Sequence, residues 1–423
     1  MSESTPARNQ KAQAFNEDWA VVWLGFLIIA IILFIYIVPV PSFGWKDASE
    51  IGSKILTASN IGAIVTQFFF VYIFGILAVL ITGKAVRPFL SVFPVIFLVT
   101  VVAVFITGNG TIKDLGLEAV IFSLSLGLII GNVFDLPQWF RSALNAELFV
   151  KIGLVLLGCG VIFGDIVKAG GLGILQALIV VLSVWYFAFW ICKKLKLDGE
   201  LSMMISSAVS ICGVSAAIAT AGAIKGDPKK LSYVISLVLI TAMPMMIGMP
   251  YIARFFGWSQ EVTGAWLGGT IDTTGAVVAS GTLVGETALK ISTIVKLSQN
   301  VLLGLAAFAI SIYWTYSADK PGKEVEKPTL GLIWDRFPKF VLGFVAASLV
   351  FSFLISPEKV KAVKDSIKSI QTLWFVLAFT SIGLETRFKD IFNSEGRRPL
   401  YAFLIAQGFN IIITLIVAFI LFG

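Results

Sequence analysis

Histidine is absent from this chain of 423 residues. Its absence excludes Ser-His-Asp and Cys-His catalysis, His-ligated metal sites and a histidine pH switch. Cysteine is scarce: Cys159, Cys192 and Cys212 lie inside apolar runs at no metal-binding spacing, so neither a disulfide framework nor a zinc site is indicated. No nucleotide-binding loop of the Walker type is present, which argues against an ATP-driven machine. We expect no enzyme, no cofactor and no metal.

Charged residues are also few. They make up 13% of the chain, about half of the roughly 25% found in soluble domains. Hydrophobic residues make up 57%, and the mean hydropathy is +0.93. Such a chain cannot cover itself with polar surface, so its solvent must be a lipid bilayer. The basic residues behind the net charge of +7 lie mainly in loops between the apolar segments, so the charge does not indicate a nucleic-acid partner, and we expect none.

Apolar segments recur along the chain, many of them near the ~20 residues that a helix needs to cross the hydrocarbon layer. The first, at 19–38, carries no charge and is too long for a signal peptide. Several others are short or rich in Gly and Ser, which suggests interrupted or re-entrant helices. We predict an all-α polytopic membrane protein with about 11–13 transmembrane segments. The thirteen candidates cover residues 19–38, 61–81, 89–107, 116–134, 148–166, 172–192, 201–224, 232–256, 263–284, 290–315, 340–355, 373–388 and 400–421.

The basic residues between these segments bear on orientation. If every segment crosses once, 19 Lys and Arg residues lie on the side of the N-terminus and 12 on the other. This bias favours a cytoplasmic N-terminus in the inner (plasma) membrane. The basic loops at 225–230 and 359–368 weigh against it. We further predict a disordered cytoplasmic tail at 1–18, scaffold helices at 19–115 and a core at 116–423.

Two internal repeats are visible. Residues 210–240 align without gaps to 270–300, although chance similarity between two Ala-rich segments is an alternative. Residues 158–166 (GCGVIFGDI) align to 383–391 (GLETRFKDI), and these partners, seven spans apart, run in opposite directions, as in inverted-topology repeats. The partners of the first repeat are two spans apart. Either one of them is re-entrant, or the segmentation is wrong there.

Two segments are too small and too polar for lipid-facing helices. In SSAVSICGVSAAIATAG (206–222) we expect an interruption near Cys212-Gly213, with tight packing of small residues as the alternative. The segment WLGGTIDTTGAVVASG (266–281) adds Asp272, and a carboxylate inside a membrane is costly enough to indicate a function. A structural role for Asp272, as a helix N-cap or the buried partner of a Lys, stays open.

Lys296 is the second charged residue inside an apolar helix. Lys296, Gln299 and Asn300 stand at positions i, i+3 and i+4, so they share one helix face. A face with an ammonium and two amides is not expected to point at lipid. Snorkelling of Lys296 to the interface and a structural pair with Asp272 are the alternatives.

Three motifs carry a resemblance to a known family: VSICGVSAAIAT at 209–220, GGTIDTTGAVVASG at 268–281 with ISTIVKLSQN after it, and the terminal GLETRFKDI. They resemble the YeiH family, whose members are named as sulfate exporters, from about residue 116 to the C-terminus. The family carries a His-Glu pair where this chain has Asp272-Thr273, so a proton-coupling role rests here on Asp272 alone. Its distant similarity to sodium/proton antiporters and bile-acid sodium symporters implies inverted repeats, two unwound helices crossing near the midplane, a core domain moving against a scaffold domain, and often a homodimer.

Both lines of reasoning predict a secondary transporter that exports a small sulfate- or sulfonate-like anion by alternating access. Free amides at half-helix N-termini form an anion cradle. The predicted ion-coupling residues, for a proton or sodium, are Asp272, Gln299 and Asn300. The predicted anion-binding residues are Ser210, Cys212, Gly213, Ser215, Thr270, Thr273, Thr274, Gly275 and Lys296.

Three other functions remain as alternatives. A sodium/proton antiporter would carry no anion cargo. An intramembrane aspartyl protease would need Asp165 to face Asp272, although Asp165 stands at a segment end. A passive channel is the third.

Overall fold

The structure is a computed structural model that describes residues 17–114, 118–316, 331–386 and 397–423. Within these ranges the regular elements are helices, and one isolated bridge joins Trp45 to Asn109. The predicted all-α polytopic class is confirmed. Eight of the described helices are long and apolar enough to cross a membrane: α1 (Glu17–Phe34), α3 (Ala58–Ile81), α4 (Val86–Thr107), α9 (Phe163–Lys194), α12 (Pro228–Phe255), α15 (Glu286–Tyr316), α18 (Pro357–Glu385) and α20 (Arg397–Phe422).

Shorter helices complete the fold. The predicted tail lies outside the described residues up to position 16, and α1 begins at Glu17, two residues before the predicted span. The apolar short helices are α6 (Ala119–Val133), α8 (Ala146–Gly158), α10 (Gly199–Ser207) with its π-helical continuation η3 (Ala208–Cys212), α11 (Val214–Ile224), α13 (Gln260–Thr270), α14 (Thr274–Val284) and α17 (Lys339–Leu349) with η4 (Val350–Leu354). The remaining elements are α2 (Ala48–Glu50), η2 (Ile51–Ile55), α5 (Gly110–Asp114), α7 (Gln138–Arg141) and α16 (Gly331–Arg336).

Side-chain contacts define the two faces of the molecule. At the start of α1, Glu17 pairs with Lys84, Lys84 donates to Asn145, and Asp18 accepts from the amide of Lys339. We call this the proximal face. At the end of α1, the ammonium of Lys359 lies 4.2 Å from the ring centre of Phe34. This end is the distal face.

The interrupted segment at 199–224 is a hairpin that opens on the proximal face. Lys230, just after the segment, pairs with Asp198 (2.8 Å) and Glu200 (3.3 Å) at its beginning. A straight helix of this length would separate those ends by about 39 Å, at 1.5 Å per residue. Burial would raise the pKa of Asp198, but the hydrogen bonds from Lys230 and from the Leu201 amide hold it below its ordinary value. The contact at these ends therefore shows that α11 folds back beside α10.

The segment at 260–284 is a second hairpin, and it opens on the distal face. Gln260 at its beginning accepts from the amide of Ala288, just after its end. Both arms lie against α15: a Cβ added at Gly268 or at Gly281 would stand 2.4 Å or 2.5 Å from atoms of Ser292. Because only glycine lacks that Cβ, the two arms can straddle one helix at close range.

The two hairpins enter from opposite faces because α12 crosses between them. Helix α15 then returns toward the proximal face, so the unit of hairpin and following helix occurs twice with inverted direction. This resolves the first sequence repeat: both partners are re-entrant, and 206–222 and 266–281 are interrupted without crossing. Helices α9 and α20 also run in opposite directions, as the second repeat predicts, although residues 387–391 of that repeat lie outside the described residues.

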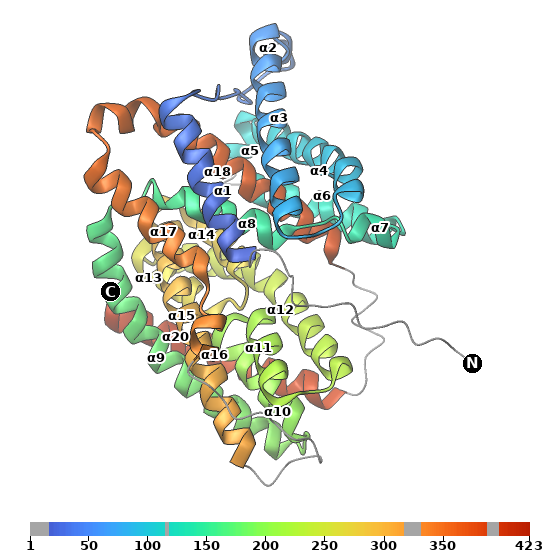
Figure 1. Cartoon of the computed structure of the whole chain (residues 1–423), viewed down its shortest axis with the longest axis vertical. Helices are drawn as coiled ribbons and strands as arrows, with labels where there is room; N and C mark the ends of the chain where they lie inside the picture. Colours follow the sequence, from blue (N-terminus) through green and yellow to red (C-terminus); the bar gives the residue numbers. More distant parts are fainter. Residues whose placement is uncertain (1–16, 115–117, 317–330, 387–396) are drawn as a thin grey trace.

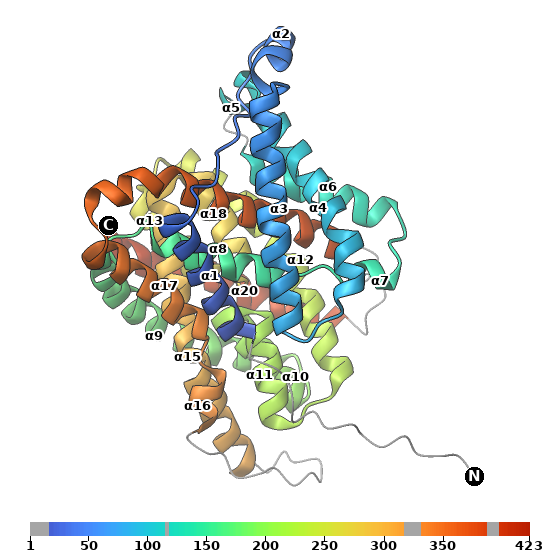
Figure 2. The same cartoon turned by 45° about the horizontal axis from the view of Figure 1, so that its top comes forward.

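The described helices form two groups (Figures 1 and 2). The first contains the hairpins α10–α11 and α13–α14 with α9, α12, α15 and α20, and we call it the hairpin bundle. The second contains α1, α3, α4, α6, α8, α17 and α18, and we call it the flanking bundle. Helix α14 provides several of the contacts between the two groups, reaching α8, α18 and α6.

Candidate functional site

The tips of the two hairpins meet inside the membrane-spanning part of the protein. Gly213, between η3 and α11, adopts φ 60° and ψ −112°, a conformation that side chains rarely permit. A Cβ there would stand 2.6 Å from Val238 and 3.0 Å from the Cβ of Asp272. Asp272 lies in the short non-helical stretch between α13 and α14. The breaks predicted near Cys212-Gly213 and within 266–281 are therefore in contact.

The carbonyl end of η3 is capped by side chains from two other helices. Lys296 donates to the carbonyl of Ile211 (2.7 Å) and to Gln299 Oε1 (2.9 Å). Gln299 in turn donates to the carbonyl of Ser210 (2.8 Å). Asn410 of α20 donates to the carbonyl of Val209 (3.1 Å). The last carbonyls of a helix have no partner within it, so these groups satisfy the negative end of the first half-helix.

The carbonyl end of α13 is capped in the same way. Gln407 and Asn410 both donate to the carbonyl of Thr270, over 3.1 Å and 3.2 Å. Gln299 also reaches the carbonyl of Gly269 over 3.3 Å. One amide each from α15 and α20 thus joins the ends of both hairpins.

The amide ends of α11 and α14 form the accessible part of the tips. The half-buried residues there are Val214 and Ser215 at the start of α11 and Thr273, Thr274 and Gly275 at the start of α14. Thr273 caps α14 by accepting from the Ala276 amide over 3.3 Å. The first amides of each helix have no partner within the helix and carry its partial positive charge. Two positive helix ends therefore converge where the tips are least buried.

This accessible part lies where the two bundles meet. A Cβ added at Gly275 would stand 3.2 Å from Ile382 of α18 and 3.3 Å from Val150 of α8. The tip of the second hairpin is thus in contact with the flanking bundle. The amide ends of the tips therefore lie at the boundary between the two bundles.

Several buried oxygens at the tips lack a hydrogen-bond partner in the described part of the chain. They are Asp272 Oδ2, Asn300 Oδ1, Gln407 Oε1 and Thr270 Oγ1. All but the last are acceptors only, since the amide oxygens and an ionised carboxylate have no proton to donate. Each of these acceptors can receive a hydrogen bond or coordinate a cation, and burying it unpaired is costly.

The structure brings all the predicted site residues to the two tips or to the face of α15 beside them, but in different environments. Ser210, Cys212, Gly213, Thr270 and Lys296 are buried, and the hydroxyl of Ser210 donates back to the carbonyl of Ser206. Lys296 is 1% exposed and does not snorkel. Among the described residues Lys296 and Asp272 form no ion pair, and Thr273 rather than Asp272 is the N-cap of α14.

Gln407 and Asn410 are not among the predicted site residues. Polar amides in membrane helices commonly serve as contacts between helices, which makes them weak signals of a site. Their spacing of three residues places them on one face of α20, which was the available signal. No group of three or more potential metal-binding side chains occurs among the residues that the structure covers.

The chain is similar to a family of membrane proteins. The pattern of the family described as "Conserved hypothetical protein 698" matches residues 92–402. A UPF0324 membrane protein of Rhodopirellula baltica is 40% identical over 317 residues, covering 72% of this chain and 58% of that protein. A UPF0324 membrane protein of Nitratidesulfovibrio vulgaris is 39% identical over 320 residues, covering 73% of this chain and 55% of that protein. The chain therefore spans between half and two thirds of these relatives' length. No solved structure matches it.

Proposed function

This chain belongs to the family described as Conserved hypothetical protein 698, with relatives named UPF0324 membrane proteins, and from this premise we propose that it is a secondary transporter of small anions. The family is the YeiH family that the motifs predict; its name as sulfate exporters is not confirmed by these matches. The observation that carries the proposal is the meeting of two inverted re-entrant hairpins at Gly213 and Asp272. Interrupted helices that meet inside the membrane are the usual binding-site architecture of secondary transporters.

The electrostatics of the tips favour an anion as cargo. The carbonyl ends of η3 and α13 are already satisfied by Lys296, Gln299 and the α20 amides. The amide ends of α11 and α14 are the ends left accessible, and they attract negative charge. Ser215, Thr273 and Thr274 add hydroxyl donors for the oxygens of a sulfate, sulfonate or carboxylate group. The positive charge of Lys296, which is buried beside the tips, adds to the attraction for an anion.

The buried oxygens provide the coupling site. Asp272, with Asn300 and Gln407 close to the same tip, would take up a proton or a sodium ion when the anion binds. The added positive charge lowers the cost of placing an anion in a medium of low dielectric constant. Release of both on the other side of the membrane would complete the cycle.

Alternating access would move the hairpin bundle relative to the flanking bundle. The accessible amide ends face α8 and α18 through Gly275, so the cargo would sit on the boundary between the bundles. In this proposal the scaffold extends beyond the predicted helices of 19–115 and includes α6, α8, α17 and α18, which lie in the region predicted as the core. A homodimer stays a prediction.

The hairpins also bear on orientation. Because the first hairpin opens on the proximal face, Lys225, Lys229 and Lys230 lie beside the N-terminal side, where the span count had not placed them. Arg254, at the end of α12, lies on the distal face, whereas the span count places it on the side of the N-terminus. The excess of Lys and Arg on the proximal face is therefore larger than the span count gives. We place the proximal face in the cytoplasm and the protein in the inner membrane.

Flux in proteoliposomes tests the proposal. Labelled sulfate or a small sulfonate should show saturable counterflow, and an inward proton or sodium gradient should drive its accumulation. Cation exchange without anion movement would instead establish the sodium/proton antiporter. A non-saturating flux without counterflow would indicate a channel. A protease is disfavoured because Asp165 is exposed at the distal start of α9, whereas Asp272 is buried at the tips.

A further inference from the structure

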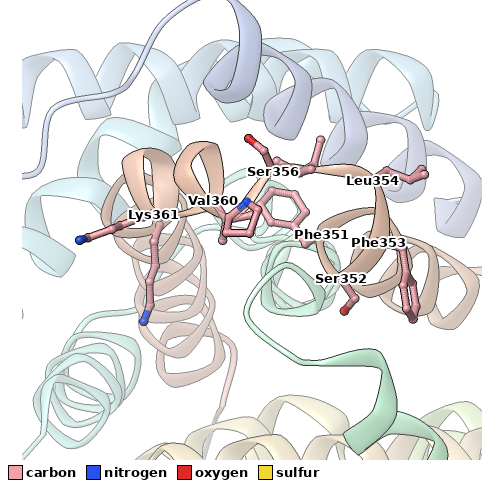
Figure 3. A pocket seen from close by; sticks show the side chains of 10 residues that line it. Phe351, Ser352, Phe353, Leu354, Ser356, Val360 and Lys361 are labelled. Atoms are coloured by element: carbon pink, nitrogen blue, oxygen red, sulfur yellow. The ribbon is translucent and has the colours of Figure 1, made fainter.

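A cavity of about 740 Å³ lies on the distal face, away from the hairpin tips. It is bounded by the end of η4, the turn at Ile355–Ser356 and the first two turns of α18. Figure 3 shows Ser352 and Phe353 on one side of it, Lys361 on the other and Ser356 in the turn between them. Ser352 is fixed in place because it accepts from the amide of Phe163 at the start of α9 (3.0 Å).

One side of this cavity is apolar and open. Phe353 is 69% exposed and Leu354 is 76% exposed. Phe34 and Ile35, at the distal end of α1, are exposed beside the same region, since Lys359 packs over the ring of Phe34. Exposed apolar surface of this kind marks a site of contact with a partner or with the membrane, and in a membrane protein acyl chains can cover it.

The other side is cationic. Lys361 and Lys364 both line the cavity, and their spacing of three residues places them on one face of α18. Among the described residues neither has an ion-pair partner, although Glu358 and Asp365 stand on the same helix. The next lysine along, Lys368, is by contrast paired with Glu286 at 3.1 Å. Two ammonium groups without an ion-pair partner among the described residues therefore stand beside an apolar surface.

We propose that this cavity binds an anionic glycerophospholipid, with its phosphate between Lys361 and Lys364 and an acyl chain along Phe353 and Leu354. Lys and Arg near a membrane surface attract anionic lipid headgroups, and basic pockets between transmembrane helices bind them. A soluble anion would use the lysines but would gain nothing from the exposed apolar side. The lipid would bind the joint between α17–η4 and α18 in the flanking bundle, independently of the cargo site.

Titration of the delipidated full chain in detergent, with bound lipid counted by native mass spectrometry, tests this proposal. Phosphatidylglycerol should bind about tenfold more tightly than phosphatidylcholine with the same acyl chains, because two lysines near a membrane surface each add attraction for an anionic headgroup. The double variant Lys361→Gln/Lys364→Gln should lose this preference, and Lys361→Arg/Lys364→Arg should keep it.

The matched control is Lys46→Gln/Lys54→Gln, which removes two charges from the region of α2 on the same face. It should keep the preference for phosphatidylglycerol. Equal loss of preference in this control, or none in Lys361→Gln/Lys364→Gln, would overturn the proposal. So would displacement of the lipid by inorganic phosphate at the same concentration, since that result would make the site one for a soluble anion.

Discussion

Gly213 and Asp272 touch at the point where the two hairpins meet, with room for only a hydrogen on Gly213. The interruptions of the two hairpins thus lie in contact. Gly213 has a backbone conformation that needs glycine, and Asp272 has a buried carboxyl group. The contact sets the distance between the amide ends of α11 and α14. A larger residue at position 213 has to push the hairpins apart or strain the backbone.

Gly213→Ala should therefore lower the stability of the protein. The backbone strain alone costs about 1–3 kcal/mol at such a position, and the new methyl group would also press on Val238. Thermal unfolding of the purified protein in detergent measures the loss. The control is Gly248→Ala in α12, where no atom lies within 4 Å of the added methyl group, and it should not lower the midpoint. Equal midpoints for the two variants would contradict the tight contact.

Lys296→Met should destabilise the protein much more than Lys290→Gln on the same helix. Without the ammonium, the carbonyl of Ile211 and the side-chain oxygen of Gln299 lose their donor, and each buried unpaired acceptor costs about 1–3 kcal/mol. Lys290 forms only a solvent-accessible pair with Glu286, worth about 0.3–0.5 kcal/mol. Chemical denaturation of both variants compares the two costs. If Lys296→Met were as mild as Lys290→Gln, the capping role of Lys296 would be wrong.

The sequence predicts where the two helices are interrupted, but not whether the chain crosses the membrane or turns back after each interruption. Small and polar residues around Gly213 and Asp272 identify interruptions because a lipid-facing helix tolerates neither. The contact between Asp198 and Lys230 shows that the chain turns back there, and no local periodicity in the sequence reveals that contact. The first repeat is the signal in the sequence that bears on direction. If both repeated segments are re-entrant and one helix crosses the membrane between them, the two segments enter from opposite faces.

The hydrogen bonds that cap the half-helices cannot be predicted from the sequence either. Gln407 and Asn410 are polar residues in an apolar helix, but their shared partner, the carbonyl of Thr270, lies 137 residues or more away along the chain. A sequence pattern identifies an amide inside an apolar helix without identifying the carbonyl that needs it. Lys296 was likewise identified as unusual, whereas its bond to Ile211 depends on the fold.

The hairpin topology predicts the side from which loop residues react with a membrane-impermeant thiol reagent. In a background with Cys159, Cys192 and Cys212 replaced by Ala, Lys84→Cys and Lys229→Cys should react from one side. Glu286→Cys should react from the other side. If Lys229→Cys reacted together with Glu286→Cys, the segment at 199–224 would cross the membrane and the first hairpin would be wrong.

Asp272→Asn should uncouple transport from its driving ion. The amide keeps the shape of the carboxyl but neither takes up a proton nor supplies the charge that a sodium ion needs. Anion counterflow without a gradient should persist, while accumulation driven by a proton or sodium gradient should disappear. Asp165→Asn, at the exposed distal end of α9, should leave both unchanged. Gradient-driven accumulation by Asp272→Asn at the level of the unmodified protein would remove Asp272 from the coupling site.

Thr273→Ala and Ser259→Ala form a matched pair that separates stability from anion binding. Each residue caps one arm of the second hairpin, Thr273 at the tip and Ser259 at the distal opening, and each accepts from a backbone amide at 3.3 Å. Loss of either cap should cost about 1 kcal/mol of stability. Only Thr273 stands at the amide end of α14 where the anion is proposed to bind, so only Thr273→Ala should also weaken sulfate binding.

Calorimetric titration with sulfate, at temperatures where both variants remain folded, provides the measurement. Thr273→Ser restores the hydroxyl and should recover most of the affinity, which a defect in folding alone would not predict. If Ser259→Ala weakened sulfate binding as much as Thr273→Ala, the effect would come from loosening the whole hairpin. The anion cradle at the amide ends of α11 and α14 would then lose its support.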